Sequence, residues 1–580
     1  MFTRRLYGRT PSHPPRASRR LQRSRPLMLE RLEDRCLLSA DPVLEWNKIA
    51  LDALQYDSTL GANALQNAPT KSSRALAIVS AAVYDAVNSI DGSHDPYLIQ
   101  VKAPKDASIT AAVAQAAHDT LVNLLPDYQP VLDADLTADL ASVPDVKARN
   151  DGAQVGRIVA AAILAARSND GSAVAMPYTP GNLPGQWRPD PLHPNQTAAG
   201  SLWGDVNPFA LRSAEQFHVP APPDITSEAY ADAYLEVKNF GGDGVTTPTM
   251  RTAEQTQIGI FWGYDGSPGL GTPPVHYNQI AETLAVQQHN SVVDNARFFA
   301  LINLAMADAG ITSWDGKYDY DFWRPVTAIR ENDPGTGPTG LGSGNPYLYN
   351  SALGIDEGDP NWKPLGAPAD NGSGTNFTPP FPSYASGHST FGGAVFQMMA
   401  DFFGTDNIHF TIGSDEFNGV TTDQNGKVRP VVLRSYNSFS QAMEENGQSR
   451  IYLGIHWQFD NQQGIEQGTD VANYVFHHFL QQRKNEHNHH EDAIDVFRPT
   501  NSHGTVLLAT TDGRPFASSL STHPPTRTIT TDAMSVHDTA ALVSDLIRYL
   551  DRKPWGGANH NGFTVVVDLH GNSPARFDVF

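Results

Sequence analysis

Apolar residues recur every three to four positions along most of the chain from about residue 42 onward. This spacing places them on one face of a helix and predicts amphipathic helices that pack against one another. In the first half of the chain the pattern is clearest over residues 75–90, 109–125, 152–166, 227–238 and 278–309. We expect Ser108 to cap the second of these helices. The last stretch is long enough for two helices, which we expect to meet near His289 and Asn290.

Residues 170–225 are rich in Pro, Gly and Trp and predict a long loop. Further helical patterns cover residues 391–403, 438–453 and 464–482. The strand signal is sparse; residues 428–433 are the main example, with a possible hairpin partner around Thr411. The pattern therefore predicts an all-α fold of helical bundles joined by long loops. We expect two four-helix bundles.

The two ends of the chain differ from this helical body. Residues 1–40 are rich in Arg and Ser and predict a largely disordered N-terminal export or targeting segment. The body spans residues 41–484. A polar, His-rich run over residues 485–494 predicts a linker, with metal binding as the alternative. Residues 495–580 predict a small C-terminal α+β appendage of unknown function, with a helix at 538–550 and a strand at 564–569.

Charge narrows the classes of partner. The chain has a net charge of −21, yet its first 40 residues hold ten Arg and only three acidic residues, which leaves 31 basic and 59 acidic residues in the rest. So acidic a body repels nucleic acid and anionic membranes, and we expect no nucleic-acid partner. Cys36 is the one cysteine, so the body has neither a thiol nucleophile nor a disulfide. The longest apolar stretch, 158–166, is too short for a transmembrane helix.

Three motifs carry candidate chemistry. The first places Lys317 seven residues before Arg324, which is two helical turns, so that both side chains can point to one side. Pro325 follows and is expected to end or kink the helix. The motif taken alone is equally typical of a solvated helix edge.

The second motif is a Pro-rich loop that leads through Ser386, Gly387 and His388 into an apolar helix. The free backbone N–H groups of a helix N-terminus bind anions. Gly387 lets a ligand approach the backbone closely, Ser386 adds a hydroxyl donor, and His388 could exchange a proton with that ligand. An ordinary Ser-capped helix is the alternative.

The third motif places Arg450 six residues before His456, with Asp460 four residues further on. Arg450 could bind the same anion, His456 offers a ring nitrogen, and Asp460 could fix the tautomer of that ring. A core histidine with an acidic neighbour is the alternative here.

Together the motifs supply three cations, a helix N-terminus, two histidines and a carboxylate, which suits a small, highly charged oxyanion. Their order, K-x6-R-P, then S-G-H, then S-R-x5-H-x3-D, resembles the superfamily of vanadium haloperoxidases and type 2 phosphatidic acid phosphatases. The stretch from Asp308 to Trp314 and the Pro-rich loop with Phe381 resemble the chloroperoxidase branch. Ala385 departs from that branch, which usually has proline there.

The resemblance implies a chloride or bromide peroxidase with vanadate as cofactor and with hydrogen peroxide and halide as substrates. It also implies roles for individual residues. Those implied to hold vanadate oxygens are Lys317, Arg324, Ser386, Gly387 and Arg450. His456 is implied to make the bond to vanadium, His388 to act as the acid–base group, and Lys317 to polarise a peroxide oxygen. Trp314 and Phe381 would line the halide side, and Asp265 would pair with an active-site arginine.

Two other functions remain open at this point. In an acid phosphatase of the same superfamily, His456 would be the nucleophile and His388 would protonate the leaving group. A non-catalytic oxyanion binder is the third class, although it would need neither histidine. Residues 29–40 resemble an export segment of bacterial secreted and surface proteins, so we expect a secreted or cell-surface location. The sequence predicts no oligomeric state.

Overall fold

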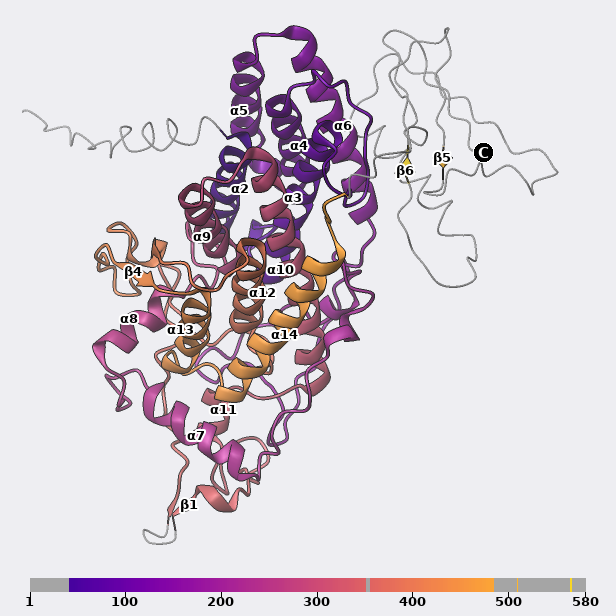
Figure 1. Ribbon diagram of the computed structural model, residues 1–580. Coiled ribbons are helices and arrows are strands. Elements are labelled where there is room, and N and C mark those ends of the chain that lie inside the picture. Colours follow the sequence, from indigo (N-terminus) through magenta and orange to yellow (C-terminus); the bar gives the residue numbers. More distant parts are fainter. Residues whose placement is uncertain (1–40, 351–354, 484–507, 510–563, 566–580) are drawn as a thin grey trace, which may run out of the picture. The chain divides into compact units, whose positions relative to one another are not determined.

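The computed structural model describes residues 41–350, 355–483, 508–509 and 564–565, and these residues are mainly helical (Figure 1). The predicted all-α fold is confirmed. The α-helices of the described residues are α2 (Pro42–Ser58), α3 (Pro69–Asp91), α4 (Ile109–Leu124), α5 (Gln129–Ser142), α6 (Val146–Arg167), α7 (Glu228–Phe240), α8 (Ala253–Phe261), α9 (Pro273–Gln287), α10 (Val292–Tyr320), α11 (Pro325–Arg330), α12 (Gly387–Phe403), α13 (Phe439–Tyr452) and α14 (Gln458–His478).

The helices form two groups. In the first group α3, α4 and α6 pack against one another, with α5 against α4. Ser108 caps α4 as predicted, because its hydroxyl accepts a hydrogen bond from the Ala111 N–H at 3.2 Å. In the second group α10, α12, α13 and α14 form a four-helix bundle. The long helix α10 also packs on α3 and so joins the two groups (Figure 1).

Glycines bring α12 and α14 unusually close. A Cβ atom at Gly468 would lie 2.0 Å from the Thr390 carbonyl oxygen, and one at Gly393 would lie 2.5 Å from that of Ile465. Any side chain at these positions would therefore push the two helices apart. The contact fixes the first half of α12 against the middle of α14, and these two helices follow the second and third motifs.

We expected the first motif to lie on one helix, but it spans the end of one helix and the start of the next. Helix α10 ends at Tyr320, where Asp321 adopts a left-handed conformation with φ of 49°. Arg324 is the N-cap of α11, and Pro325 occupies the first turn of that helix. The prediction was wrong because proline disfavours a helical conformation of the residue before it and is well suited to the first turn of a new helix. Lys317 and Arg324 thus reach the same place from two elements.

Strands are short and few among the described residues. Strand β3 (Phe410–Gly413) pairs with β4 (Leu433–Tyr436) as an antiparallel hairpin. The partner around Thr411 is as expected, but the second strand begins where the predicted one, 428–433, ends. The two-residue strands β1 (Tyr349–Asn350) and β2 (Ile355–Asp356) pair with each other, as do β5 (Leu508–Ala509) and β6 (Thr564–Val565).

Helix α14 begins six residues earlier than predicted, and α9 begins before the predicted start at residue 278. Helices α2, α5 and α8 lie outside the predicted ranges. The 170–225 loop has no α-helix and contains the short 3-10 helices η3 (Trp203–Asp205) and η4 (Ala214–Phe217). The His-rich run and the 538–550 helix lie outside the described residues. The domain boundaries at residues 40, 484 and 494 stay predictions.

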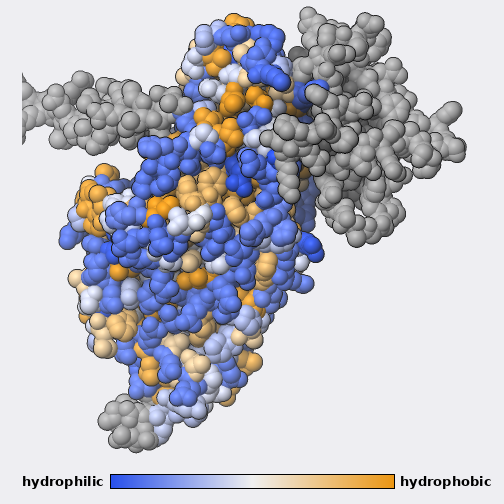
Figure 2. All heavy atoms as spheres, in the orientation of Figure 1, coloured by the Kyte–Doolittle hydropathy of each residue, from blue (hydrophilic) through white to orange (hydrophobic). Residues whose placement is uncertain are grey.

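Polar residues cover most of the face seen in Figure 2, and apolar ones gather over the β3–β4 hairpin. The exposed apolar side chains of that region are Val420, Val428, Val431 and Leu433. None of the described helices combines the length and hydropathy that a membrane-spanning segment needs.

Candidate functional site: a buried cluster of three cations and two histidines

The three motifs meet at one end of the second bundle. Lys317 comes from the last turn of α10, and Arg324 from the N-cap of α11. Ser386 precedes α12, Arg450 lies in the last turn of α13, and His456 lies in the loop before α14. All five side chains are buried, with relative exposures between 0% and 2%. The structure therefore brings together the residues that the sequence singled out.

Lys317 is held by the Pro-rich loop. Its ammonium donates to the carbonyl oxygens of Pro382 at 3.1 Å, Ser383 at 2.9 Å and Ala385. These bonds use its three N–H groups and pin the loop before the Ser-Gly-His turn. Burial, together with the nearby Arg324, lowers the pKa of Lys317 well below its ordinary value. A bound anion would offset both effects.

Arg324 connects the loop to the third motif. Its Nε donates to the Phe381 carbonyl at 2.9 Å, and its Nη1 donates to the Ile455 carbonyl at 2.8 Å and to His456 Nε2 at 2.9 Å. Its Nη2 is buried and has no hydrogen-bond partner. Burial lowers the pKa of Arg324 to about 9, so the guanidinium stays charged at neutral pH.

His456 and Asp460 share the bond that the sequence predicts. His456 Nδ1 lies 2.7 Å from Asp460 Oδ2, and the same carboxylate oxygen accepts from the Ser383 hydroxyl and from the Trp457 N–H at 3.2 Å. With its Nδ1 hydrogen donated to the carboxylate, His456 keeps its lone pair on Nε2. Burial, followed by the neighbouring cations, lowers the pKa of His456 well below its ordinary value. The ring is therefore neutral and offers Nε2 as a ligand atom.

Arg450 is paired with Asp265, as the sequence predicts. Its Nη2 lies 2.9 Å from Asp265 Oδ2, and its Nη1 donates to the Trp262 carbonyl at 3.2 Å. Its Nε is buried without a partner. The ion pair orients the guanidinium and leaves Nε as its unbonded nitrogen.

Helix α12 presents its first turn to this cluster. Ser386 is the N-cap, and its hydroxyl accepts from the Ser389 N–H at 3.4 Å. The N–H groups of a first turn have no acceptor within their own helix, so they remain available to an anion. A Cβ atom at Gly387 would lie 3.1 Å from the Trp314 ring, so glycine also lets this indole pack against the turn.

His388 occupies the same turn and is bonded away from the helix. Its Nε2 donates to the Gly263 carbonyl at 2.8 Å, which leaves Nδ1 as the proton-accepting atom. Burial, followed by the charge of Arg450, lowers the pKa of His388 to about 3. The imidazole is therefore neutral at neutral pH and carries its lone pair on Nδ1.

Trp314 and Phe381 form an aromatic wall beside the cations. Their ring centroids are 4.8 Å apart, and Lys317 Nζ lies 5.5 Å from the first ring and 5.3 Å from the second. The Trp314 N–H donates to the Ala199 carbonyl at 3.2 Å. Fixed in this way, the two rings give the site one apolar side.

The donor set fits an oxyanion. Three basic side chains and two carboxylates are buried together, and two guanidinium nitrogens there have no partner. An unpaired buried donor costs about 1–3 kcal/mol, so an anion that accepts from both would relieve that cost. Vanadate and phosphate both have the required shape and charge.

Sequence reasoning missed several partners. Ser383 lies in the Pro-rich loop, and its hydroxyl bonds Asp460, a role that the three motifs do not indicate. The carbonyl groups of Trp262, Gly263 and Phe381 leave no signal in the sequence, because any residue carries one. The role that the resemblance implies for Asp265 did point to this segment.

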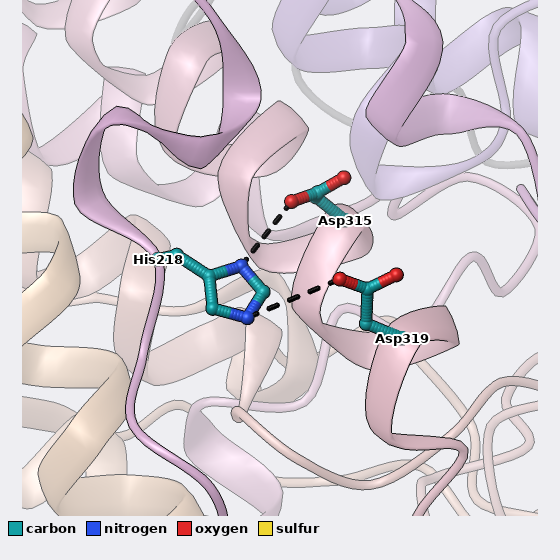
Figure 3. Close-up of side chains that lie close together, drawn as sticks. All are labelled: His218, Asp315 and Asp319. Carbon is teal, nitrogen blue, oxygen red and sulfur yellow. Dashed lines mark hydrogen bonds and ion pairs between the residues drawn. The ribbon is translucent and has the colours of Figure 1, made fainter.

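A second group of ligand-type side chains lies on the outer side of α10. Figure 3 shows His218 between Asp315 and Asp319, with ring nitrogens 3.3 Å and 3.9 Å from their carboxylate oxygens. It is the one such group found among the described residues. Each ring nitrogen already faces a carboxylate, and Asp319 is 63% exposed. Contacts within the group account for it, so we assign no ion.

Two family models match this chain, one in the first part of the helical body and one in the part that carries the three motifs. A model of the vanadium chloroperoxidase N-terminal domain matches residues 32–201, and a model described as the VCPO second helical-bundle domain matches residues 297–485. The vanadium chloroperoxidase of Curvularia inaequalis is 31% identical over 522 residues, which cover 75% of this chain and 81% of that protein. The second match contains the Lys317, His388 and His456 motifs.

Solved structures agree with these matches. A bacterial vanadium-dependent iodoperoxidase is 25% identical, with a TM-score of 0.60 over 76% of this chain and 98% of that one. A bacterial vanadium-dependent chloroperoxidase in its holo form is 18% identical and shares the fold, with a TM-score of 0.53 over 71% of this chain and 92% of its own. The identity and coverage of the Curvularia inaequalis relative, taken with the site geometry, show that this chain belongs to the vanadium haloperoxidase family.

Proposed function

We propose that this chain is a vanadate-dependent haloperoxidase, which oxidises halide with hydrogen peroxide to hypohalous acid. The observation that carries the proposal is the pair of buried, unpartnered guanidinium nitrogens, Arg324 Nη2 and Arg450 Nε, beside a neutral His456. The names of the similar proteins, a chloroperoxidase and an iodoperoxidase, support the same activity.

The residues that would hold vanadate are those of the three motifs. Arg324 and Arg450, each with a buried nitrogen that has no partner, would donate to its oxygens, and the Gly387 N–H and the Ser386 hydroxyl would donate beside them. His456 Nε2 would be the protein ligand to the metal; in this structure that nitrogen accepts a hydrogen bond from Arg324 Nη1. Bound vanadate(V) supplies a Lewis acid that activates peroxide towards attack by halide without changing oxidation state.

His388 moves the proton. Its neutral Nδ1 accepts a proton from incoming hydrogen peroxide, while the Gly263 carbonyl holds Nε2–H in place. Lys317 keeps a positive charge beside the reacting oxygens, and the loop carbonyls prevent it from swinging away. Trp314 and Phe381 exclude water on the halide side. A poorly solvated anion beside aromatic rings and cations is a better nucleophile than a hydrated one.

The experiment compares two activities of the purified chain. One arm follows peroxide-dependent halogenation of a phenolic dye with chloride, bromide and iodide, with and without orthovanadate. The other arm follows hydrolysis of p-nitrophenyl phosphate without vanadate. We expect vanadate-stimulated halogenation; phosphate-ester turnover without it would favour the phosphatase of the same superfamily, with His456 as nucleophile.

We also propose that the chain is exported to the cell surface or secreted, on the resemblance of residues 29–40 to an export segment. Fractionation of the source cells tests this. Recovery of the full-length chain only from the cytoplasm would contradict it.

A further inference from the structure

One peptide group behind the site makes two buried hydrogen bonds. It joins Gly263 to Tyr264: its carbonyl accepts from His388 Nε2 at 2.8 Å, and its N–H donates to Glu416 Oε1 at 2.9 Å. A peptide group is planar and rigid. The carboxyl of Glu416 and the imidazole of His388 are therefore linked through one flat unit.

The backbone at this point needs support. Tyr264 has a φ of 54°, a left-handed conformation that is unfavourable for a bulky residue and persists only where the surroundings hold it. Its hydroxyl accepts from the Asp415 N–H at 2.7 Å, and its ring stacks on His276 at 4.5 Å. A Cβ atom at Gly263 would lie 2.2 Å from Glu416 Oε1, so only glycine admits the carboxyl this closely.

The support comes from one turn, the 3-10 helix η6 (Asp415–Phe417) with the residue before it. Ser414 donates its hydroxyl to the Phe261 carbonyl at 2.7 Å, Asp415 bonds the Tyr264 hydroxyl, and Glu416 bonds the Tyr264 N–H. Three consecutive residues thus hold the segment that carries the acceptor of His388.

Glu416 is itself clamped. Arg429 Nη1 lies 2.7 Å from Glu416 Oε2 and 2.6 Å from Asp370 Oδ1, and all three side chains are buried. Two carboxyls share one guanidinium, so the trio is neutral only if it keeps one proton. Burial, followed by the charge of Asp370, raises the pKa of Glu416 well above its ordinary value. The Glu416 carboxyl is thus fixed in position without adding a negative charge behind the oxyanion site.

We propose that Glu416, clamped by Arg429 and Asp370, is a positioning residue that fixes the Gly263–Tyr264 peptide and thereby holds His388 in the tautomer protonated on Nε2. The effect on catalysis rests on the proposed function of His388. The assignment of the tautomer is independent of that function. Without Glu416 the Tyr264 N–H loses its acceptor, and only the bonds from Ser414 and Asp415 to neighbouring residues still direct the Gly263 carbonyl at His388 Nε2. The orientation of that carbonyl, and with it the tautomer of His388, is then less firmly fixed.

The test is the tautomer of His388 in vanadate-free protein at neutral pH, read from nitrogen-15 NMR of histidine-labelled chain. A His388→Ala variant identifies the signal. We expect one tautomer in the wild type and in Glu416→Gln, whose amide oxygen still accepts from Tyr264. We expect a mixture in Glu416→Leu, and also in Gly263→Ala, which displaces the carboxyl by a different route.

Activity gives the second readout. In Glu416→Leu we expect kcat to fall on the order of 10-fold or more, with the Kd for vanadate within a few-fold of wild type, because positioned proton transfer contributes about 10²–10⁴-fold. Asp85→Asn is the matched control: Asp85 is another buried carboxylate that accepts backbone N–H bonds, from Tyr97, Leu98 and Ile99. It should lower the melting temperature without changing the tautomer.

A single, unchanged tautomer in Glu416→Leu and Gly263→Ala would overturn the proposal, and so would a mixture in the Asp85→Asn control. An absence of halide oxidation in the wild type, together with the expected tautomers, would instead refute the proposed function alone.

Discussion

His456 Nδ1 lies 2.7 Å from Asp460 Oδ2, and this bond decides which ring nitrogen faces the cations. His456 lies in the loop before α14 and Asp460 in the first turn of that helix, and the carboxylate also accepts from the Ser383 hydroxyl of the Pro-rich loop. One buried carboxylate thus orients the imidazole that we propose as the metal ligand and ties it to the loop that carries the second motif.

Replacing Asp460 with Ala should weaken vanadate binding about 10- to 100-fold, which is the usual effect of removing the partner of a ligating histidine. An equilibrium titration of metal-free protein measures the Kd. Asp470→Ala, an exposed position further along α14, serves as the control and should bind as wild type. An unchanged Kd in Asp460→Ala would show that the bond does not set the ligand atom.

Arg324→Lys keeps the charge and removes the planar fork. The guanidinium makes three bonds and has one unused nitrogen, and an ammonium cannot replace that geometry. Hydrogen bonds to charged groups are worth about 1.5–3 kcal/mol, so we expect vanadate affinity to fall by at least about 10-fold. Arg330→Lys, which alters a guanidinium on the same short helix, should leave the vanadate affinity unchanged. Equal affinities in the two variants would contradict this reading of Arg324.

The aromatic wall should govern halide more than peroxide. In Trp314→Ala or Phe381→Ala we expect the KM for halide to rise several-fold, because water enters beside the cations and the halide is better solvated there. The KM for peroxide is the internal reference, since His388, which would take the proton of peroxide, is held by the Gly263 carbonyl and not by either ring. Parallel changes in both KM values would point to a general disturbance of the site.

Asp308 makes stability depend on pH with a defined sign. Its carboxylate accepts N–H bonds from Phe209, Ala210 and Leu211, yet burial outweighs these bonds and raises its pKa to about 6. The folded chain then binds this proton more tightly than the unfolded chain. Its contribution to stability is complete below about pH 4 and is lost as the pH rises to about 6.

Unfolding of wild type and Asp308→Asn at several pH values tests this sign. As the pH rises from 4 to 7, the free energy of unfolding of the Asn variant should increase relative to that of wild type. The increase should reach up to about 3 kcal/mol, as expected for a shift of roughly two pKa units. A shift towards wild type would mean that the three N–H bonds outweigh burial.

Much of the fold follows from local pattern. Ser108 caps the helix that the sequence assigns to it, whereas Ser386 caps a helix that begins four residues before the predicted start at residue 391. The break near His289 is present, with a φ of 56° at that residue. Helix α5 escaped notice because Leu132 is its one buried residue, so it shows no apolar stripe. Tertiary contacts, which no local window contains, hold such a helix in place.

The candidate site was predictable in its side chains but not in its backbone. Order and residue type identified Lys317, His388 and His456, yet the carbonyls that hold them come from residues of any kind. The assumption of one helix for Lys317 and Arg324 failed because Pro325 starts a helix there. Glu416 lies 28 residues after His388 in a polar stretch without a motif, so only the fold brings it to Gly263.

The most direct test of the account is an orthovanadate titration of metal-free protein, followed by peroxide-dependent bromide oxidation in wild type and in His456→Ala. We predict that wild-type activity rises from near zero and saturates at one vanadate per chain, that phosphate competes for the site, and that His456→Ala retains no vanadate after gel filtration. Activity that is independent of vanadate, or full activity in His456→Ala, would contradict it.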